Sequence, residues 1–436
     1  MRNVRVGLIG FGTIGSGVVK IFQDYGADIA EKVGINLVLK KIADLDIVSP
    51  RTAFVPQEML TTDAREIVSD PEINIVIELM GGIEPARSLI LQAINNKKHI
   101  VTANKALLAI DGDLIFRAAQ ECSVDIGFEA SVAGTIPVIK TLREALVANR
   151  IESLLGIING TSNYILSKMT DEHLDFATAL KQAQAKGYAE ADPSFDVNGT
   201  DAKHKLAILL SIAYGKKVNI DAIYCEGITK ITPEDIKFAA ELGYRVKLLA
   251  IAIRREGRVE ARLHPTLVPA NHPIARVENN YNALHIVGSS ANAVFLHGEG
   301  AGMMPTASAV MSDVIDIARN ISCGISGRVP SRHPDERNLA ELAIVPMEDV
   351  ATNYYIRFMA LDRPGVLSKI SGIFAKYAIS IASVIQKGRM QDGSAVPLVM
   401  LTHSSRERAV CEALLEIRNL DVIAGEPMLI RIEERD

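Results

Sequence analysis

Short apolar runs alternate with stretches of helical periodicity through residues 1–135. The apolar runs predict buried strands, and the stretches with apolar positions three and four apart predict amphipathic helices. The predicted strands are residues 4–9, 36–43, 74–79, 99–102 and 125–129, and the predicted helices are residues 13–23, 85–95 and 105–121. Strands that alternate with helices favour an α/β fold with a mostly parallel sheet, and so predict a first domain over residues 1–135.

The pattern changes over residues 136–304. Helical patterns cover residues 136–148, 171–186 and 201–214, and strand-like runs cover residues 245–254, 282–288 and 293–296. This mixture predicts a separate α+β domain that binds the substrate. A further helical pattern at residues 305–321 is expected to complete the first domain.

The remaining sequence divides into a linker and a small domain. Residues 322–350 are rich in proline, glycine and charge, which indicates a linker. Residues 351–436 then show strand, helix, strand, strand, helix and strand, at residues 354–361, 365–377, 379–387, 395–402, 406–415 and 422–432. This order is that of a ferredoxin-like βαββαβ domain.

Composition narrows the class of protein. The 436 residues are 48% apolar and 23% charged, which is ordinary for a soluble enzyme of two or three domains. The net charge of −5 favours neither nucleic acid nor an anionic membrane as a partner. No signal peptide or membrane-spanning run is apparent, so a cytoplasmic location is expected. The scattered cysteines form no CxxC pair, which predicts reduced thiols rather than disulfides or a zinc site: Cys122, Cys225, Cys323 and Cys411.

A glycine-rich turn follows the first predicted strand and opens the first predicted helix. A GxGxxG motif stands at Gly10, Gly12 and Gly15. In a dinucleotide site the first glycine permits the tight turn, the second lets the backbone approach a pyrophosphate, and the third lets the helix pack closely on the strand. The motif alone also occurs in structural turns, but here strand, turn, helix and second strand all fit. The predicted cofactor-binding residues in the turn are Gly10, Phe11, Gly12, Thr13, Ile14 and Gly15.

The end of the second strand bears on the choice of cofactor. Asp44 stands there, at a longer spacing from the glycines than the usual 20 or so residues. Its carboxylate could bind a ribose 2′-hydroxyl and favour NAD. Lys40, Lys41 and Arg51 lie nearby and could instead meet a 2′-phosphate, favouring NADP. Both cofactors stay open on this reasoning.

Six further strings carry a resemblance to the homoserine dehydrogenase family. They occur in the family's order at residues 78–82, 102–105, 129–137, 156–166, 187–206 and 298–314, and read ELMGG, TANK, EASVAGTIP, GIINGTSNYIL, GYAEADPSFDVNGTDAKHKL and GEGAGMMPTASAVMSDV. The string LDRPGVL at residues 361–367 resembles an ACT domain, a module that often binds amino acids. With no aspartate kinase segment before it, the chain resembles the monofunctional form.

The resemblance implies a Rossmann-like cofactor domain, a substrate and dimerisation domain, and assembly as a homodimer or homotetramer. The implied reaction is the NAD(P)-dependent interconversion of L-aspartate 4-semialdehyde and L-homoserine, in threonine, methionine and isoleucine biosynthesis. Threonine is the expected effector at the ACT domain, where a helix N-terminus after Pro364 suits a ligand carboxylate. A purely oligomerising role for that domain is the alternative.

The catalytic residues follow from the same resemblance. Asp201 and Lys205 are four residues apart, so they share a helix face, and by spacing alone they would be an ordinary surface ion pair. In the family, this lysine is the proposed donor of a proton to the alkoxide, and this aspartate holds the substrate. Lys105, in TANK, is expected between nicotinamide and substrate as a second catalytic cation and a cofactor contact.

Other site residues are implied by resemblance. Glu190 is expected to grip the amino group of homoserine, with Asp196 and Gly187 in the same pocket, because a zwitterion needs acidic partners for its ammonium. Gly302 is expected to approach the cofactor. Asn159, Thr161 and Asn163 are expected to line the pocket. A loop that matches the family's monovalent-cation site is expected to hold a structural Na⁺ through a carboxylate and backbone carbonyls: Glu129, Val132, Gly134 and Ile136.

Two rival functions stand against this interpretation. An acylating semialdehyde dehydrogenase needs a nucleophilic cysteine, and the four cysteines lie outside the matched site strings. A non-catalytic amino-acid sensor on a Rossmann scaffold would be expected to lack the set of Glu190, Asp201 and Lys205, which is present.

Overall fold

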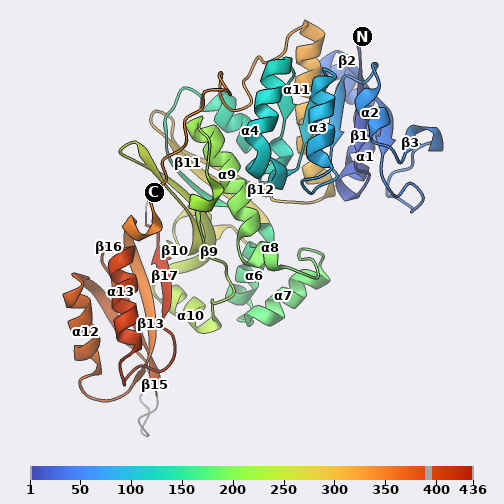
Figure 1. Cartoon of the computed structure of the whole chain (residues 1–436). Coiled ribbons are helices and arrows are strands. Elements are labelled where there is room, and N and C mark those ends of the chain that lie inside the picture. The colour runs from blue at the N-terminus through green and yellow to red at the C-terminus, as the bar shows by residue number, and fades with distance from the viewer. Residues whose placement is uncertain (1, 388–394, 435–436) are drawn as a thin grey trace. The chain divides into compact units, whose positions relative to one another are not determined.

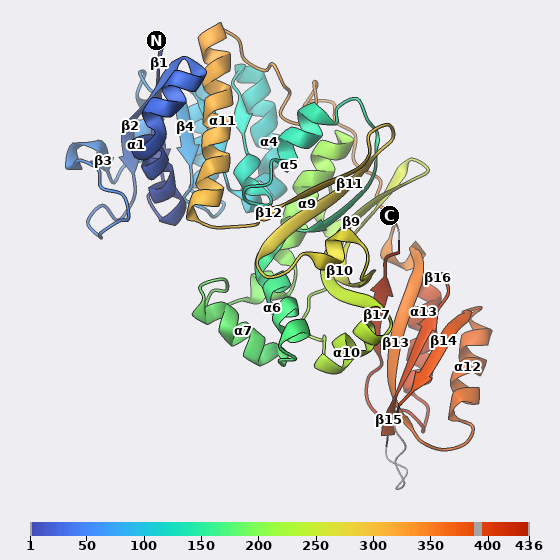
Figure 2. The same cartoon turned by 180° about the vertical axis from the view of Figure 1, so that it is seen from behind.

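The structure, a computed structural model, describes residues 2–387 and 395–434. The chain forms two compact units. The first consists of residues 1–160, 200–221 and 280–342, and the second of residues 161–199, 222–279 and 343–436. Figure 1 and Figure 2 show the elements of each unit from opposite sides.

A six-stranded parallel sheet forms the centre of the first unit. Its strand order is β3-β2-β1-β4-β5-β6, the order of a dinucleotide-binding fold. The strands that form the middle of the sheet are buried apolar runs, as the sequence predicts. The six strands are β1 (Arg2–Ile9), β2 (Ile35–Ala43), β3 (Leu60–Thr61), β4 (Ile75–Glu78), β5 (His99–Thr102) and β6 (Ile126–Gly127).

Helices cover both faces of this sheet. On one face α1 (Thr13–Val33) and α11 (Met303–Cys323) lie side by side, and their apolar residues join the strands in one core. Their backbones approach so closely that a Cβ at Gly17 would lie 2.8 Å from the carbonyl oxygen of Met303. The other face carries α2 (Arg65–Ser69), α3 (Ala86–Asn95) and α4 (Lys105–Cys122), as Figures 1 and 2 show. The late helix α11 therefore belongs to the same layered core as the first strands.

The first unit also contains a smaller antiparallel arrangement. Strand β11 (Tyr281–Gly288) pairs with β7 (Ile151–Ile157) on one side and with β12 (Asn292–Glu299) on the other. Helix α9 (Thr200–Tyr214) packs against α4 and ends at Gly215, whose φ of +59° suits a helix stop. The contact between α9 and α4 brings residues from two distant parts of the chain together.

The second unit contains helices α6 (Gly160–Asp171), α7 (Phe176–Ala185) and α8 (Ser194–Val197). The first residue of α6, Gly160, belongs to the first unit. It also contains the long antiparallel pair β9 (Tyr244–Arg255) and β10 (Arg258–Pro269), the short β8 (Tyr224–Cys225) and α10 (Pro233–Glu241). Strand β8 runs parallel to β10, and Cys225 pairs with Leu263. These elements form the body on which the C-terminal strands continue.

The C-terminal strands form the predicted βαββαβ domain. Its sheet has the order β17-β13-β15-β14, with two helices that share an apolar core with it. Strand β17 also pairs in parallel with β10, so the sheet runs from the body into the C-terminal domain. The elements are β13 (Ala351–Leu361), α12 (Val366–Lys376), β14 (Ile381–Gln386), β15 (Ala395–Thr402), α13 (Glu407–Arg418) and β17 (Met428–Ile432).

Several sequence-based boundaries are wrong. The predicted helix at 171–186 is α7, which begins only at Phe176, and the helix before it, α6, is not predicted because it begins in the polar NGTSNY string that does not read as amphipathic. The predicted helix at 136–148 is the short α5 (Val138–Lys140) running into a wider π-turn at Thr141–Ala145. Strands β7 and β10 and helix α10 were not predicted. No helix among the described residues is long and apolar enough to cross a membrane.

Candidate functional site

A buried carboxylate shared by two lysines marks the candidate active site in the first unit. Asp201, in the first turn of α9, lies 2.8 Å from Nζ of Lys105 and 2.7 Å from Nζ of Lys205. Asn159 donates its side-chain amide to the same carboxylate at 2.9 Å, and Lys205 also donates to the carbonyl of Ile158 at 2.9 Å. We call Lys105, Asp201, Lys205 and Asn159 the Asp201 cluster.

The cluster keeps its carboxylate ionised. Burial alone would raise the pKa of Asp201, but the ammonium groups of Lys205 and Lys105 outweigh it and hold that pKa below its ordinary value. The side chain of Lys105 is 37% exposed, whereas that of Lys205 is 11% exposed. One cation of the cluster therefore faces solvent and the other is enclosed.

A hydrogen-bonded relay fixes the start of α4, where Lys105 stands. The fully buried carboxylate of Glu78, at the end of β4, accepts the backbone N–H of Met80 at 2.9 Å and the hydroxyl of Thr102 at 2.7 Å. The Thr102 oxygen in turn accepts the N–H of Asn104 at 3.0 Å, and the Asn104 side chain caps α4. Burial raises the pKa of Glu78. Glu78 thus acts on the residue that precedes Lys105 without touching Lys105 itself.

The glycine-rich turn has the contacts that a dinucleotide site needs. A Cβ at Gly10 would lie 2.7 Å from the backbone of Leu79, and one at Gly15 would lie 2.1 Å from the Gly10 carbonyl oxygen, so both positions require glycine. A Cβ at Gly12 would meet no described atom within 4 Å. The face at Gly12 is therefore open where a pyrophosphate would lie, at the N-terminus of α1.

Asp44 forms a hydrogen bond with the backbone of the glycine-rich turn. Its carboxylate accepts the N–H of Phe11 at 2.5 Å and that of Asp46 at 2.9 Å, and Arg51 lies 3.5 Å from it. Arg51 also stacks over the Phe11 ring and lines a cavity of about 270 Å³ beside the turn. The other two candidate cations are engaged elsewhere, Lys40 with Asp70 and Glu72, and Lys41 with Glu66. Of the three, only Arg51 lines this cavity.

The predicted substrate residues Gly187, Glu190 and Asp196 lie in the second unit. Gly187 has a φ of +73°, Glu190 is exposed, and Asp196 lies in α8, where its carbonyl accepts the Ser162 hydroxyl at 3.0 Å. Thr161 donates its hydroxyl to the carbonyl of Tyr188 at 2.6 Å, so it supports the Gly187 turn.

Asn163 has a structural role that the sequence did not indicate. Its buried amide donates to the carbonyls of Val277 and Asn279, and the enclosed Lys247 ammonium lies 3.4 Å from its oxygen. Burial lowers the pKa of Lys247 to about 8. Asn163 therefore holds α6 to the 277–279 loop.

In the loop predicted to hold Na⁺, the carboxylate is bound by the backbone of the following helix. Both side-chain oxygens of Glu129 accept backbone N–H groups, from Ile139 at 2.7 Å and from Lys140 at 2.9 Å. The backbone N–H of Glu129 binds the buried Asp313 at 2.8 Å. Ala133 and Gly134 both have a positive φ, which turns the loop tightly. Within the described ranges no three His, Cys, Asp or Glu side chains are grouped to hold a metal.

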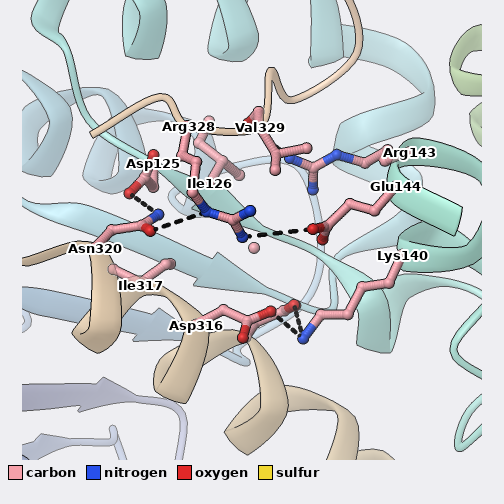
Figure 3. Close-up of a pocket in the computed structure, with 12 residues that line it drawn as sticks. Asp125, Ile126, Lys140, Arg143, Glu144, Asp316, Ile317, Asn320, Arg328 and Val329 are labelled. Atoms are coloured by element: carbon pink, nitrogen blue, oxygen red, sulfur yellow. Dashed lines mark hydrogen bonds and ion pairs between the residues drawn. The ribbon is translucent and has the colours of Figure 1, made fainter. Parts of the chain in front are cut away.

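A small polar cavity lies next to this loop and does not form part of the Asp201 cluster. It measures about 40 Å³. Figure 3 shows several of its charged side chains bonded to one another. Lys140 lies 2.5 Å from Asp316, and Arg328 lies 3.4 Å from Glu144. Its size and internal pairing suit water and a structural joint between α5 and α11.

Gly302 immediately precedes α11 and has a φ of +140°. A Cβ there would lie 3.1 Å from the Pro305 ring, so the turn that opens the helix favours glycine. Its predicted approach to the cofactor stays a prediction.

Comparison with known proteins covers the whole chain. The family model described as homoserine dehydrogenase matches residues 137–315, its NAD-binding domain matches residues 10–129, and the ACT domain matches residues 354–414. A homoserine dehydrogenase of Neisseria gonorrhoeae is 42% identical over 433 residues, covering 99% of each chain. The chain belongs to the homoserine dehydrogenase family. A homoserine dehydrogenase of Synechocystis sp. is 45% identical over 437 residues, covering 98% of this chain and 99% of the relative.

A solved homoserine dehydrogenase has the same fold. The crystal structure from Thiobacillus denitrificans is 45% identical, has a TM-score of 0.92, and covers 100% of this chain and 99% of that one. The chain is accordingly an oxidoreductase with homoserine dehydrogenase activity and a nicotinamide-binding domain. The non-catalytic sensor gains no support from these relatives.

Two residues that act on the Asp201 cluster or lie beside it are not singled out by the sequence. Glu78 stands in the ELMGG string but carries no signal other than an acidic residue at the end of a buried strand. His204 lies between Asp201 and Lys205 on α9, and burial together with the nearby Lys105 lowers its pKa although Asp201 opposes the shift. Its place three residues after Asp201 was the available signal.

Proposed function

We propose that the Asp201 cluster carries the chemistry of homoserine oxidation and of its reverse. The observation that supports this is one ionised carboxylate held between two lysines, beside the start of α4 at the C-terminal edge of the parallel sheet. Ligands of such folds gather at that edge. The nicotinamide cofactor, when bound, supplies or accepts the hydride.

Lys205 moves the proton. In reduction its ammonium gives a proton to the oxygen of the former aldehyde as the hydride reaches the carbon, and the product is the alcohol. In oxidation neutral Lys205 takes the hydroxyl proton as the C–H bond of the alcohol loses its hydride. Asp201 fixes the position of Nζ of Lys205, and Lys105 stabilises the negative charge that develops on the oxygen.

Substitution of Lys205 tests this proposal. Lys205→Ala is expected to lower kcat by about 100-fold to 10,000-fold, the usual contribution of a general acid or base, while cofactor binding persists. Lys203→Ala, on the same helix, is the matched control and should keep kcat within about twofold. Turnover is followed by absorbance of reduced nicotinamide, and cofactor affinity by fluorescence titration. Equal kcat for the two variants would contradict the role of Lys205.

The substrate's ammonium is assigned to Glu190 and Asp196. Glu190 is exposed on the loop after α7, and Asp196 closely precedes α9, the helix of Asp201 and Lys205. Glu190→Gln should raise the KM for homoserine about tenfold, the size of a charged hydrogen bond, with a smaller effect on kcat. An unchanged KM would remove Glu190 from the pocket.

NADP is the cofactor that the cavity beside the glycine-rich turn favours. Asp44 is engaged by the N–H groups of Phe11 and Asp46, and Arg51 offers a guanidinium that suits a 2′-phosphate. Arg51→Gln should lower kcat/KM for NADP⁺ about tenfold or more and leave that for NAD⁺ nearly unchanged. Equal losses with both cofactors would argue against this role.

Na⁺ is assigned to the loop of Glu129, Val132, Gly134 and Ile136, through backbone carbonyls rather than the carboxylate. All-oxygen ligands suit a hard cation. Added Na⁺ should raise the melting temperature of cation-free protein in a saturable way, and choline at equal ionic strength should not. Identical curves with the two salts would exclude the ion.

Threonine is the proposed ligand of the ACT domain, and a homodimer or homotetramer the proposed assembly. The N-terminus of α12 follows Gly365, a position with φ of +89° whose Cβ would meet no described atom within 4 Å. Truncation near Pro346 would remove β17 from its partner β10, so the full chain is the right material. Calorimetry with threonine, and with serine as the control, tests the ligand. Light scattering tests the oligomeric state.

A further inference from the structure

A buried ionic cluster lies where the ACT domain meets the body of the second unit. Strand β17 pairs with β10, with Arg431 opposite Thr266. The Arg431 guanidinium forms two bonds with the carboxylate of Glu407 on α13. It also donates to the carboxylate of Glu226 at 2.7 Å and to the hydroxyl of Tyr224 at 3.0 Å. We call Arg431, Glu407, Glu226 and Tyr224 the Arg431 cluster.

The cluster joins two parts of the molecule through one planar group. Glu407 and Arg431 belong to the ACT domain, whereas Tyr224 and Glu226 belong to the segment around β8 in the body. The Tyr224 hydroxyl donates to Glu226 at 2.9 Å, so two residues of the body are held together on the same guanidinium. The side chain of Arg431 is 4% exposed, which makes these bonds stronger than surface ion pairs.

The segment that contains Glu226, residues 225–228, packs directly against the turn at residues 197–199. A Cβ at Gly227 would lie 2.2 Å from the carbonyl oxygen of Val197. The N–H of Ile228 binds that same oxygen at 2.9 Å. On the other side, a Cβ at Gly199 would lie 3.0 Å from Sγ of Cys225. Backbone meets backbone at Gly227, and a side chain packs against Gly199, so a displacement of one segment displaces the other.

This turn links the proposed substrate carboxylate to the catalytic helix. Asp196 precedes the turn, and α9 with Asp201 and Lys205 begins directly after it at Thr200. The N–H of Gly199 binds the carbonyl of Asp196 at 3.1 Å, so the turn is closed on itself. Its position therefore sets the approach of Asp196, and α9 follows it directly in the chain.

The ACT domain has its own connection to the cluster. Arg363 and Lys369, at the start of α12, both pair with Asp421, which follows α13, at 2.7 and 2.8 Å. Helices α12 and α13 also share the domain's apolar core. A ligand that moves the start of α12 therefore acts on α13, whose first residue is Glu407.

We propose that Glu226 is a positioning residue for homoserine, held in place by Arg431 of the ACT domain, and that this ion pair carries the effect of an ACT-domain ligand to the active site. The proposal rests on the proposed roles of Asp196 and the Asp201 cluster. Glu226 acts through the turn at residues 197–199. A ligand that shifts α13 or β17 changes the bond from Arg431 to Glu226 and, through it, the fit of the substrate.

Glu226→Gln tests the proposal in the full chain, with Glu241→Gln as the matched control. Glu241 pairs with Lys387 of the C-terminal region, at 35% side-chain exposure, and lies on α10 rather than on the Glu226 segment. Glu226→Gln should raise the KM for homoserine about tenfold, as expected for one charged hydrogen bond, with a change in kcat below about threefold and an unchanged KM for the cofactor. Glu241→Gln should leave all three within about twofold of the wild type.

Threonine, as the probe, tests the regulatory part. In Glu226→Gln, threonine should bind in calorimetry with wild-type affinity but inhibit at least fivefold less. Glu226→Asp, which restores the charge, should recover part of both effects. If Glu226→Gln does not fold, Tyr224→Phe, which removes only the hydroxyl between Glu226 and Arg431, should raise the KM in the same direction by a smaller factor.

The outcomes separate this proposal from the proposed function. Wild-type protein that does not oxidise homoserine would overturn both. Normal wild-type turnover with an unchanged KM in Glu226→Gln and Tyr224→Phe would overturn the positioning role alone, even if both melted at a lower temperature. Wild-type protein that threonine does not inhibit, or a Glu226→Gln variant inhibited as strongly as wild type, would overturn the regulatory route.

Discussion

The Asp201 cluster and the Arg431 cluster are both buried groups of charge, but they are built in opposite ways. In the first, one carboxylate is shared by two lysine ammonium groups, and one lysine side chain is 37% exposed. In the second, one guanidinium is shared by the carboxylates of Glu407 and Glu226 and is 4% exposed. An ammonium can release a proton and rotate, whereas a guanidinium stays charged and holds a fixed planar geometry. The first arrangement therefore suits proton transfer, and the second suits joining two pieces of structure.

Lys205→Arg is expected to have the largest effect, because it tests whether the Asp201 cluster needs a cation that can release its proton. Arginine keeps the positive charge beside Asp201 but does not give up its proton near neutral pH. We expect kcat to fall about 100-fold or more, with the melting temperature close to that of wild type. Steady-state turnover and differential scanning fluorimetry measure the two quantities. Retention of most of the activity would show that Lys205 contributes charge rather than a proton.

A third buried group consists of two neighbouring carboxyl groups, those of Glu129 and Asp313, and it makes stability depend on pH. Burial and the neighbouring Asp313 raise the pKa of Glu129 to about 7, and burial raises that of Asp313 to about 6. Because the folded-state pKa of Glu129 exceeds the unfolded value of 4.5, the folded state binds more protons between these values, and stability falls as pH rises through that window. At about 1.4 kcal/mol per pKa unit, Glu129 accounts for about 3 kcal/mol of this fall.

Urea unfolding of Glu129→Gln from pH 4.5 to pH 7.5 checks the assignment. The free energy of unfolding should depend less on pH in this variant than in wild type. Glu144→Gln, at the exposed pair with Arg328, is the control and should keep the wild-type slope. Parallel curves for all three proteins would show that Glu129 titrates normally.

Arg431→Lys is the reciprocal of the Lys205 substitution and is expected to have a smaller effect. A lysine keeps the charge but cannot bond Glu407 and Glu226 together in one plane. The free energy of unfolding should drop by about 2 kcal/mol, the size of one lost charged hydrogen bond in a buried setting. Arg408→Lys, at an exposed pair with Glu348, should cost less than about 0.5 kcal/mol. Equal losses would place the Arg431 cluster among ordinary surface pairs.

The two clusters also show what local patterns in the sequence can predict. The parallel sheet, the glycine-rich turn and the βαββαβ domain follow from short apolar runs and helical spacing, and the structure has all three. The Asp201–Lys205 contact follows from the spacing of four residues on a helix. The same reasoning leaves out Lys105, which reaches Asp201 only because α4 packs on α9. That approach is set by tertiary packing, and the family resemblance indicated only that Lys105 lies between nicotinamide and substrate.

Strand β10 was missed because its buried face is charged. Arg262 is 1% exposed and binds Glu433 at 3.0 Å, near the end of the chain, and His264 at 2.9 Å. Alternation of apolar and polar residues does not detect a strand whose polar positions are buried by partners far along the chain. The hydrogen bonds of the Glu129 carboxylate are not visible in the sequence for a related reason, since the backbone N–H groups that it accepts come from the next helix.

Substitution of Glu78 is expected to have the smallest effect and gives the most specific test, because Glu78 acts on the Asp201 cluster without belonging to it. Glu78→Gln keeps the size of the side chain but replaces one of its two acceptor oxygens with a donor, so either the Met80 N–H loses its acceptor or the Thr102 hydroxyl has to accept where it now donates. Lys105 would then start α4 from a less fixed position. We expect kcat to fall about fivefold to tenfold, or about 1 kcal/mol in transition-state stabilisation. Thr102→Val, which breaks the next bond of the relay, should give a loss of similar size, and the double variant should lose little more than either single one because both act through the same relay. Independent, multiplying losses in kcat would mean that Glu78 supports the loop at residues 80–82 by a separate route and that the placement of Lys105 depends on Asp201 alone.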